Sequence, residues 1–229
     1  MNRNPVFGLC AGGCGSAYLV ELLRANGLNG VFHEKKPDLR DEGLAYYRGD
    51  LALETAKALL RQTRWRVRIE VSNRLFSLAE PLSQAFAGAR FIHLHRDGWD
   101  SVRSIWSNPR VEEIFAQDLR FQTLGEYSGG DVFPAVCRYW RNINARIADD
   151  LEGRLSVSIK FDDLIAGQLH SLENFLGLRL AVRSIDPVNI KTDLRKNRRP
   201  EFADWSPAEQ QTFWVECGET MTRLGYVHA

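Results

Sequence analysis

A glycine-rich segment near the N-terminus has the composition of a phosphate-binding loop. Gly8-Leu-Cys-Ala-Gly-Gly-Cys-Gly-Ser16 follows a short apolar run and precedes leucines at helical spacing. In a strand–loop–helix unit of this kind, backbone N–H groups and the positive helix end face a bound phosphate. It is not a Walker loop, because Ser16 stands where lysine should follow the last glycine, nor a dinucleotide fingerprint, because Tyr18 occupies the third glycine position. The residues alone equally allow a turn that only lets helix and strand pack closely.

Arg96 and Ser104 form a second candidate anion site. Arg96 follows the apolar run at 89–95, and Ser104 lies two helical turns further along a predicted helix. Arginine offers a planar fork of donors to phosphate and serine adds a hydroxyl, so both can bind one anion if the intervening turn folds back. Each also has a plainer interpretation: Arg96 can pair with Asp97 or Asp100, and Ser104 can be an ordinary serine on a helix surface.

The dipeptide His33-Glu34 is a candidate general base. It ends a short apolar run that begins at Gly30, at the carboxyl end of a predicted strand, where α/β enzymes bind their ligands. Neighbouring residues of a strand face opposite sides of the sheet, so only one of the two side chains is expected in a site. Glu34 is the favoured candidate and His33 the alternative.

Short apolar strands alternate with helices along the chain. Strands are predicted at 5–10, 30–33, 66–71, 89–95 and 155–161, and helices at 17–26, 51–62, 75–86, 99–107, 132–151, 162–176 and 206–224. This order predicts an α/β fold with a central parallel sheet flanked by helices on both faces. The segments 108–130 and 186–204 lack such a pattern and are expected to be loops that build the site.

Core and cap residues complete this prediction. The residues expected to be buried are Phe7, Leu9, Ile92, Leu94, Val157 and Ile159. Ser206, Pro207 and Glu209 form a helix-start signal with an N-cap, a first-turn proline and a capping-box acid. Asp50 is the candidate N-cap of the helix at 51–62.

The bulk composition is that of an ordinary soluble domain. Of the 229 residues, 44% are hydrophobic and 26% are charged, and we expect a single domain over 1–229. A net charge of +1 gives no overall field for nucleic acid or an acidic membrane. No apolar run reaches the ~20 residues of a membrane span, and glycines interrupt the uncharged stretch at 6–20 that otherwise resembles a signal peptide.

The four cysteines indicate the compartment. They are Cys10, Cys14, Cys137 and Cys217. None forms a CxxC pair and no histidine cluster lies near them, so neither a metal site nor a disulfide framework is expected, and we infer a cytoplasmic location.

Together the two candidate anion motifs resemble those of the bacterial-type sulfotransferases that depend on 3′-phosphoadenosine 5′-phosphosulfate. That family has a loop of the form Arg/Lys-Ser-Gly-Thr-Thr and a strand–turn–helix of the form Arg-Asp-Pro-x-Asp-x-x-x-Ser. Here they correspond to Gly13-Cys-Gly-Ser-Ala17 and Arg96-Asp-Gly-Trp-Asp-Ser-Val-Arg-Ser104. Softer similarities, for example at 161–164 and 224–226, extend over nearly the whole chain. The resemblance implies a P-loop-like three-layer fold.

The resemblance also implies roles for individual residues. The first loop would bind the 5′-phosphosulfate, Arg96 and Ser104 the 3′-phosphate, and a basic C-terminal run would close over the nucleotide. The donor-binding residues implied are Gly12, Gly13, Cys14, Gly15, Ser16, Ala17, Arg96, Ser104, Arg195, Lys196 and Arg198. A histidine or glutamate base follows the second strand in the family, which fits His33 and Glu34. A basic run is also typical of a solvated surface.

Gly13 departs from the family pattern. The family has a lysine or arginine there, whose cation contacts the transferring group or the leaving oxygen, and Ala17 replaces a hydroxyl as well. Either another cation takes over, with Lys35 and Lys36 nearest in sequence, or the protein binds the donor without turning it over.

Three functions therefore follow from the sequence. The first is a sulfotransferase acting on a hydroxyl or amine of a small molecule or glycan. The second is a non-catalytic nucleotide-binding protein on the same scaffold. The third is a divergent P-loop nucleotide kinase, which the missing lysine opposes. The aromatic residues expected to wall an acceptor pocket are Trp106, Phe115, Phe121 and Tyr127.

Overall fold

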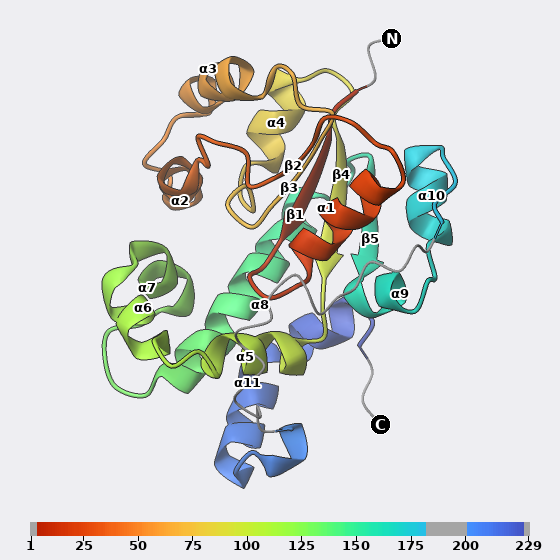
Figure 1. Cartoon of the computed structure of the whole chain (residues 1–229). Helices are drawn as coiled ribbons and strands as arrows, with labels where there is room; N and C mark the ends of the chain where they lie inside the picture. The colour runs from red at the N-terminus through yellow and green to blue at the C-terminus, as the bar shows by residue number, and fades with distance from the viewer. Residues whose placement is uncertain (1–3, 182–200, 227–229) are drawn as a thin grey trace.

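The computed structural model describes residues 4–181 and 201–226, and its centre is a parallel sheet (Figure 1). Five strands lie in the order β2-β3-β1-β4-β5. They are β1 (Val6–Cys10), β2 (Val31–His33), β3 (Ile69–Ser72), β4 (Arg90–His95) and β5 (Ser156–Lys160). All neighbouring strands pair in parallel, so their carboxyl ends meet at one edge of the sheet. The predicted α/β fold is confirmed.

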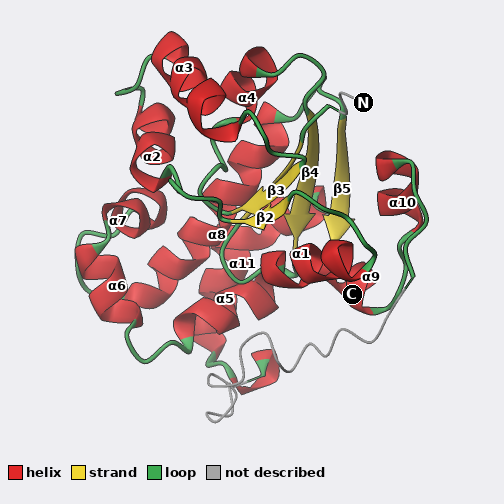
Figure 2. Cartoon of the chain, turned by 45° about the horizontal axis from the view of Figure 1, so that its top comes forward, coloured by secondary structure: helices red, strands yellow, loops and turns green. Residues whose placement is uncertain are grey.

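Helices lie on both faces of the sheet (Figure 2). The α-helices of the described residues are α1 (Ser16–Ala25), α2 (Arg40–Arg48), α3 (Leu53–Arg64), α4 (Ala79–Ala85), α5 (Gly98–Trp106), α6 (Val111–Gln117), α7 (Leu119–Gly125), α8 (Val132–Asp150), α9 (Phe161–Ile165), α10 (His170–Leu176) and α11 (Pro207–Arg223). A short 3-10 helix, Phe202–Asp204, precedes α11. Within this part of the chain, no helix combines the length and apolar character needed to cross a membrane.

Two hydrophobic clusters cover the two faces. Phe7 and Leu9 of β1 belong to a cluster that includes α3, α4, α8 and α11. Val6 and Cys10, on the opposite face of the same strand, belong to a cluster with α1, α9 and α10. The predicted core residues that are buried are Phe7, Leu9, Ile92, Leu94 and Ile159. Val157 is only half-buried, because β5 is an edge strand.

Several helix boundaries differ from the prediction, for example that of α4, which begins at Ala79 rather than at residue 75. The helix expected over 162–176 is divided into α9 and α10, because Gly167 between them adopts φ 75°, which an α-helix cannot contain. Asp50 is not the N-cap of α3, since that position belongs to Ala52, and Asp50 forms an ion pair with Arg48 at 2.7 Å instead. The capping box of Ser206 and Glu209 is present as predicted.

The segment 108–130 is helical, contrary to the expectation of a loop. Val111 and Phe115 of α6 and Leu124 of α7 are buried in the cluster that includes α8. Asp118 ends α6 and caps α7, because its side chain accepts a hydrogen bond from the Arg120 N–H. Because α6 ends and α7 begins at Asp118, the apolar residues do not keep one helical spacing across this segment. For this reason the sequence pattern did not predict either helix.

His93 and His95 are buried side by side on β4. His93 is hydrogen-bonded to Asn144 at 3.1 Å, and His95 to the hydroxyl groups of Tyr226 at 3.0 Å and Ser158 at 2.8 Å. Burial disfavours the imidazolium and lowers the pKa of His93 to about 4 and that of His95 to about 3. Both rings are therefore neutral in the folded protein near neutral pH.

The histidine pair predicts a loss of stability in mild acid. As the pH falls below about 6.5, the unfolded chain binds protons that the folded chain does not, so the stabilisation present above that pH is lost progressively. At about pH 5 the loss should reach up to about 2 kcal/mol per histidine. Urea unfolding at about pH 7.5 and pH 5 measures it. The double variant His93→Asn/His95→Asn should lose most of this pH dependence, and an unchanged dependence would contradict the assignment.

Candidate functional site

The glycine-rich loop joins the end of β1 to the start of α1. Gly13 and Gly15 have φ values of 78° and 88°, in the left-handed region that favours glycine. Gly15 is the N-cap residue of α1, where no side chain caps the helix, and the first turn holds no acidic residue. The loop therefore presents an uncapped helix N-terminus, which suits a phosphate or phosphosulfate.

Ser104 and Arg96 both lie beside this loop. A Cβ placed on Gly13 would lie 3.5 Å from the Ser104 Oγ. A Cβ placed on Gly15 would overlap the ring of Phe161, the first residue of α9, and the Arg96 guanidinium carbon lies 5.3 Å from the centre of that ring. The two motifs, far apart in sequence, thus meet at the carboxyl edge of the sheet.

Arg96 also makes the ion pair that its plainer interpretation predicted. Its Nη2 donates to Asp100 Oδ2 at 2.8 Å, while its buried Nε has no hydrogen-bond partner among the described residues. Asp162 is close enough that Arg96 favours its ionised form, although burial has the larger effect and raises the Asp162 pKa. An anion at Arg96 would therefore have to share the guanidinium with Asp100.

His33 and Glu34 lie at the same edge of the sheet. His33 Nε2 is hydrogen-bonded to Ser16 Oγ at 3.0 Å, which brings the imidazole to the loop. Glu34 lies beyond the last residue of β2 with φ 48°, and its carboxylate is 3.1 Å from Arg74 Nη2. Because Glu34 has left the strand, the alternation that would admit only one of the pair does not apply. Arg74 is shared, since it also pairs with Asp38.

A buried ion pair fixes the backbone after this dipeptide. Arg64 and Glu70 are fully buried and paired at 2.8 Å. Glu70 accepts a hydrogen bond from the Lys35 N–H at 3.2 Å, and Arg64 donates to the Lys35 carbonyl at 3.1 Å. Burial raises the pKa of Glu70, and Arg64 opposes that effect. No local pattern predicted this pair, and its signal in the sequence is a charged residue, Glu70, between the apolar residues of β3.

The basic residues predicted to contribute a cation do not contact the glycine-rich loop where the structure describes them. Lys36 is paired with Asp38 at 2.6 Å with its side chain 77% exposed, and Lys35 Nζ lies 5.3 Å from the Phe32 ring centre. Neither contact involves the loop. The basic residues Arg195, Lys196 and Arg198 lie outside the described residues.

The aromatic residues expected to wall a pocket mostly pack against one another. Phe115 is fully buried in the core, so the expectation of a pocket wall is wrong for this residue. The Phe115 ring centre lies 5.0 Å from that of Phe121 and 5.8 Å from that of Tyr127. The Trp106 ring packs against Phe133, with ring centres 4.8 Å apart. The buried positions of α6 and α7 explain this packing.

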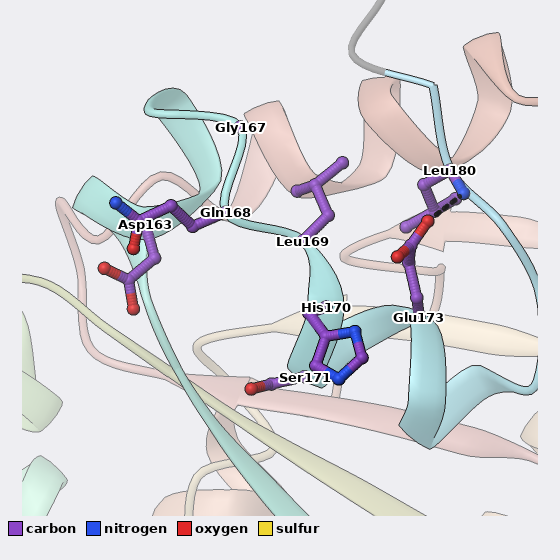
Figure 3. A pocket seen from close by; sticks show the side chains of 8 residues that line it. All are labelled: Asp163, Gly167, Gln168, Leu169, His170, Ser171, Glu173 and Leu180. Atoms are coloured by element: carbon purple, nitrogen blue, oxygen red, sulfur yellow. Dashed lines mark hydrogen bonds between the residues drawn. The ribbon is translucent and has the colours of Figure 1, made fainter.

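A cavity of about 550 Å³ lies at the connection between α9 and α10 (Figure 3). Asp163, Gln168 and His170 are among the residues that line it. None of the donor-binding candidates at 12–17, 96 and 104 lines this cavity, so it is separate from the glycine-rich loop.

Comparison with known proteins identifies the fold. No protein-family model matches the chain, and no curated protein does. Among solved structures, the chain is similar to a sulfotransferase domain from the curacin biosynthetic pathway, with 14% identity, TM-score 0.53 and 99% of each chain covered. It is also similar to a sulfotransferase from Alicyclobacillus acidocaldarius, with 15% identity, TM-score 0.54 and coverage of 100% of this chain and 98% of that one. Mouse sulfotransferase SULT7A1 in complex with PAP has 11% identity, TM-score 0.56 and coverage of 96% and 86%. The chain thus has the sulfotransferase fold, as its motifs predicted.

The contact between Gly15 and Phe161 predicts an unusual sensitivity to one methyl group. Gly15→Ala should destabilise the protein by about 1–3 kcal/mol more than Gly27→Ala, because the added carbon overlaps the ring. Gly27 is the matched control, since its φ is 78° and its added Cβ would meet nothing within 4 Å. Urea unfolding of both variants gives the difference, and equal losses would show that the ring moves aside freely.

Proposed function

We propose that this protein is a sulfotransferase that moves a sulfuryl group from 3′-phosphoadenosine 5′-phosphosulfate to a hydroxyl or amine of a small molecule or glycan. The observation that carries the proposal is the meeting of two anion-binding motifs, with Ser104 against Gly13 and Arg96 beside the ring that packs on Gly15. A structural neighbour is complexed with PAP, which supports a donor of this type. We propose a cytoplasmic location, because all four cysteines are free and buried.

The proposed donor site has two ends. Backbone N–H groups of the loop from Gly12 to Ala17, at the N-terminus of α1, bind the 5′-phosphosulfate. Arg96 and Ser104 bind the 3′-phosphate. We also propose that a basic segment covers the nucleotide. This part of the proposal rests only on the sequence, which has Arg195, Lys196 and Arg198 there. These residues suit the two phosphate groups of the donor. The loop offers a helix N-terminus without a side-chain cap, and the buried Nε of Arg96 has no hydrogen-bond partner among the described residues.

The proposed reaction is an in-line transfer. The acceptor oxygen or nitrogen forms a bond to sulfur while the bond between sulfur and the bridging oxygen breaks, and the electron pair leaves with 3′-phosphoadenosine 5′-phosphate. The acceptor proton passes to the pair formed by His33 and Glu34, of which Glu34 is the proposed base and His33 the neighbour that contacts Ser16. No metal takes part in this proposal.

A second function is favoured by one observation. Gly13 supplies no cation to the loop, so the protein could bind the donor without transferring the sulfuryl group. Turnover of labelled donor with a panel of hydroxyl and amine acceptors tests this directly. Binding of the donor without transfer to any acceptor would favour the non-catalytic function.

The proposed role of Arg96 predicts a ligand-specific loss of affinity. Arg96→Ala should weaken binding of 3′-phosphoadenosine 5′-phosphate by about tenfold or more, because a hydrogen bond to a charged group contributes roughly 1.5–3 kcal/mol. Binding of adenosine 5′-phosphate, which lacks the 3′-phosphate, should hardly change. Arg103→Ala is the matched control, because Arg103 pairs with the same Asp100. Calorimetric titration of wild type and both variants with each nucleotide measures these affinities. An equal loss of affinity of Arg96→Ala for both nucleotides would show that Arg96 is structural.

The proposed base predicts a loss of turnover without loss of donor affinity. Glu34→Gln keeps the shape but accepts no proton, so kcat should fall about 10²–10⁴-fold while the donor Kd stays within a few-fold. His33→Asn should reduce kcat less, or equally if the two residues act as a unit. Asp38→Asn is the control, since it removes the other carboxylate that pairs with Arg74. Full activity of Glu34→Gln with inactive His33→Asn would reverse the assignment.

A further inference from the structure

Arg120 is a nearly buried cation without a counter-charge. Its residue exposure is 6%, its Nε has no hydrogen-bond partner, and no carboxylate in residues 4–181 or 201–226 forms an ion pair with it. Arg64, which is buried to a similar degree, is paired with Glu70. A buried charge without compensation is costly, so the position of Arg120 calls for an anion that the described residues do not supply.

Asn73 connects Arg120 to the glycine-rich loop. Arg120 Nη1 donates to Asn73 Oδ1 at 3.2 Å. The other amide atom, Asn73 Nδ2, would lie 3.9 Å from a Cβ placed on Gly12. Asn73 follows β3, and Gly12 follows β1. The guanidinium of α7 is thus brought to the same sheet edge as the loop.

Tyr139 of α8 is a second buried polar group at this place. Its side chain is fully buried, and its hydroxyl has no hydrogen-bond partner within the described part of the chain. The hydroxyl would lie 3.7 Å from a Cβ placed on Gly12, and the Arg120 guanidinium carbon is 5.9 Å from the ring centre. Burial raises the pKa of Tyr139, so the phenol stays protonated and its O–H can donate a hydrogen bond to an anion.

Asp118 is the nearest acid in sequence, but its carboxylate is engaged elsewhere. Asp118 Oδ1 accepts from the backbone N–H of Arg120, and Oδ2 faces Arg40 at 3.6 Å. The Arg120 guanidinium instead lies 4.9 Å from the Phe121 ring centre. The aromatic rings hold the cation in place and leave its charge uncompensated.

We propose that Arg120, with Asn73 and Tyr139, binds the 5′-phosphosulfate end of the donor and supplies the cation that the loop lacks at Gly13. This inference rests on the proposed function. At Gly13 itself φ is 78°, a backbone conformation that residues with a side chain rarely adopt, so a lysine or arginine is disfavoured there. Arg120 reaches the loop from the side of β3 and α8, and would stabilise the negative charge left on the 5′-phosphate oxygen when the bond to sulfur breaks.

The test separates the two ends of the donor. Arg120→Met should weaken 3′-phosphoadenosine 5′-phosphate by about tenfold or more and leave adenosine 3′-phosphate, which lacks the 5′-phosphate, within about twofold. Arg120→Lys should restore part of the affinity. The control is Arg138→Met, because Arg138 is paired with Glu216 on α11. This selectivity is the opposite of that expected for Arg96.

Ligand-free stability distinguishes binding from a structural role. Removal of an uncompensated charge should leave the Arg120→Met protein unfolding at the same temperature as wild type or a higher one. A lower unfolding temperature together with equal weakening of all ligands would overturn the inference. If Arg120→Met does not fold, the same comparison is made with Arg120→Gln, which also lacks the charge, and undiminished affinity for the 5′-phosphate in that variant overturns the inference.

Binding of 3′-phosphoadenosine 5′-phosphate to wild type shows whether the role of Arg120 or the proposed function has failed. If wild type binds 3′-phosphoadenosine 5′-phosphate and Arg120→Met binds it equally well, the inference fails and the function stands. If wild type does not bind this nucleotide, the function fails, and inorganic pyrophosphate becomes the probe. Thermal stabilisation by pyrophosphate that needs Arg120 would still support the anion site, and its absence would overturn it.

Discussion

The parallel pairing of β1 with β3 and β4 is the constraint on which the rest of the site depends. All five residues of β1 are buried, and its register with both neighbours brings the ends of the strands into line. Four of the five strands are then each followed by one part of the site. The glycine-rich loop follows β1, Glu34 follows β2, Asn73 and Arg74 follow β3, and Arg96 follows β4. Local sequence sets what each loop contains, and the sheet brings the loops together.

Electrostatics at this edge is local and largely self-compensated. The chain carries a net charge of +1, yet Arg74 is shared by two carboxylates and Arg96 is paired with Asp100. These partly exposed pairs contribute little to stability, but they hold flexible side chains in one geometry. Arg120 differs because its charge is buried and unpaired among the described residues. A site of this kind is ordered before an anion arrives, which lowers the entropy lost on binding.

The sequence predicted the five strands, the longer helices and the residues of both motifs, because each depends on neighbours within about ten residues. Gly13 and Ser104 were both named from sequence, and the structure places them near each other, since a Cβ built on Gly13 would lie 3.5 Å from the Ser104 Oγ. The pair of Arg64 and Glu70 and the approach of Arg120 to Asn73 depend on tertiary packing, so no local pattern announced them. Helix α2 (Arg40–Arg48) was missed for a related reason, since only Gly43 and Leu44 are buried in it and apolar periodicity is absent.

The shortest strand, β2, stands at one edge of the sheet with only three residues. Exposed strand edges are templates for pairing with other chains, and short edge strands limit this because they offer few unpaired backbone groups. The chain leaves β2 at once through Glu34, whose left-handed φ of 48° turns the backbone away from an extended course. Glu34, which we propose for proton transfer, therefore also limits the length of an edge strand that other chains can pair with. A substitution there that allowed an extended backbone would increase self-association in concentrated solution, in addition to its effect on sulfuryl transfer.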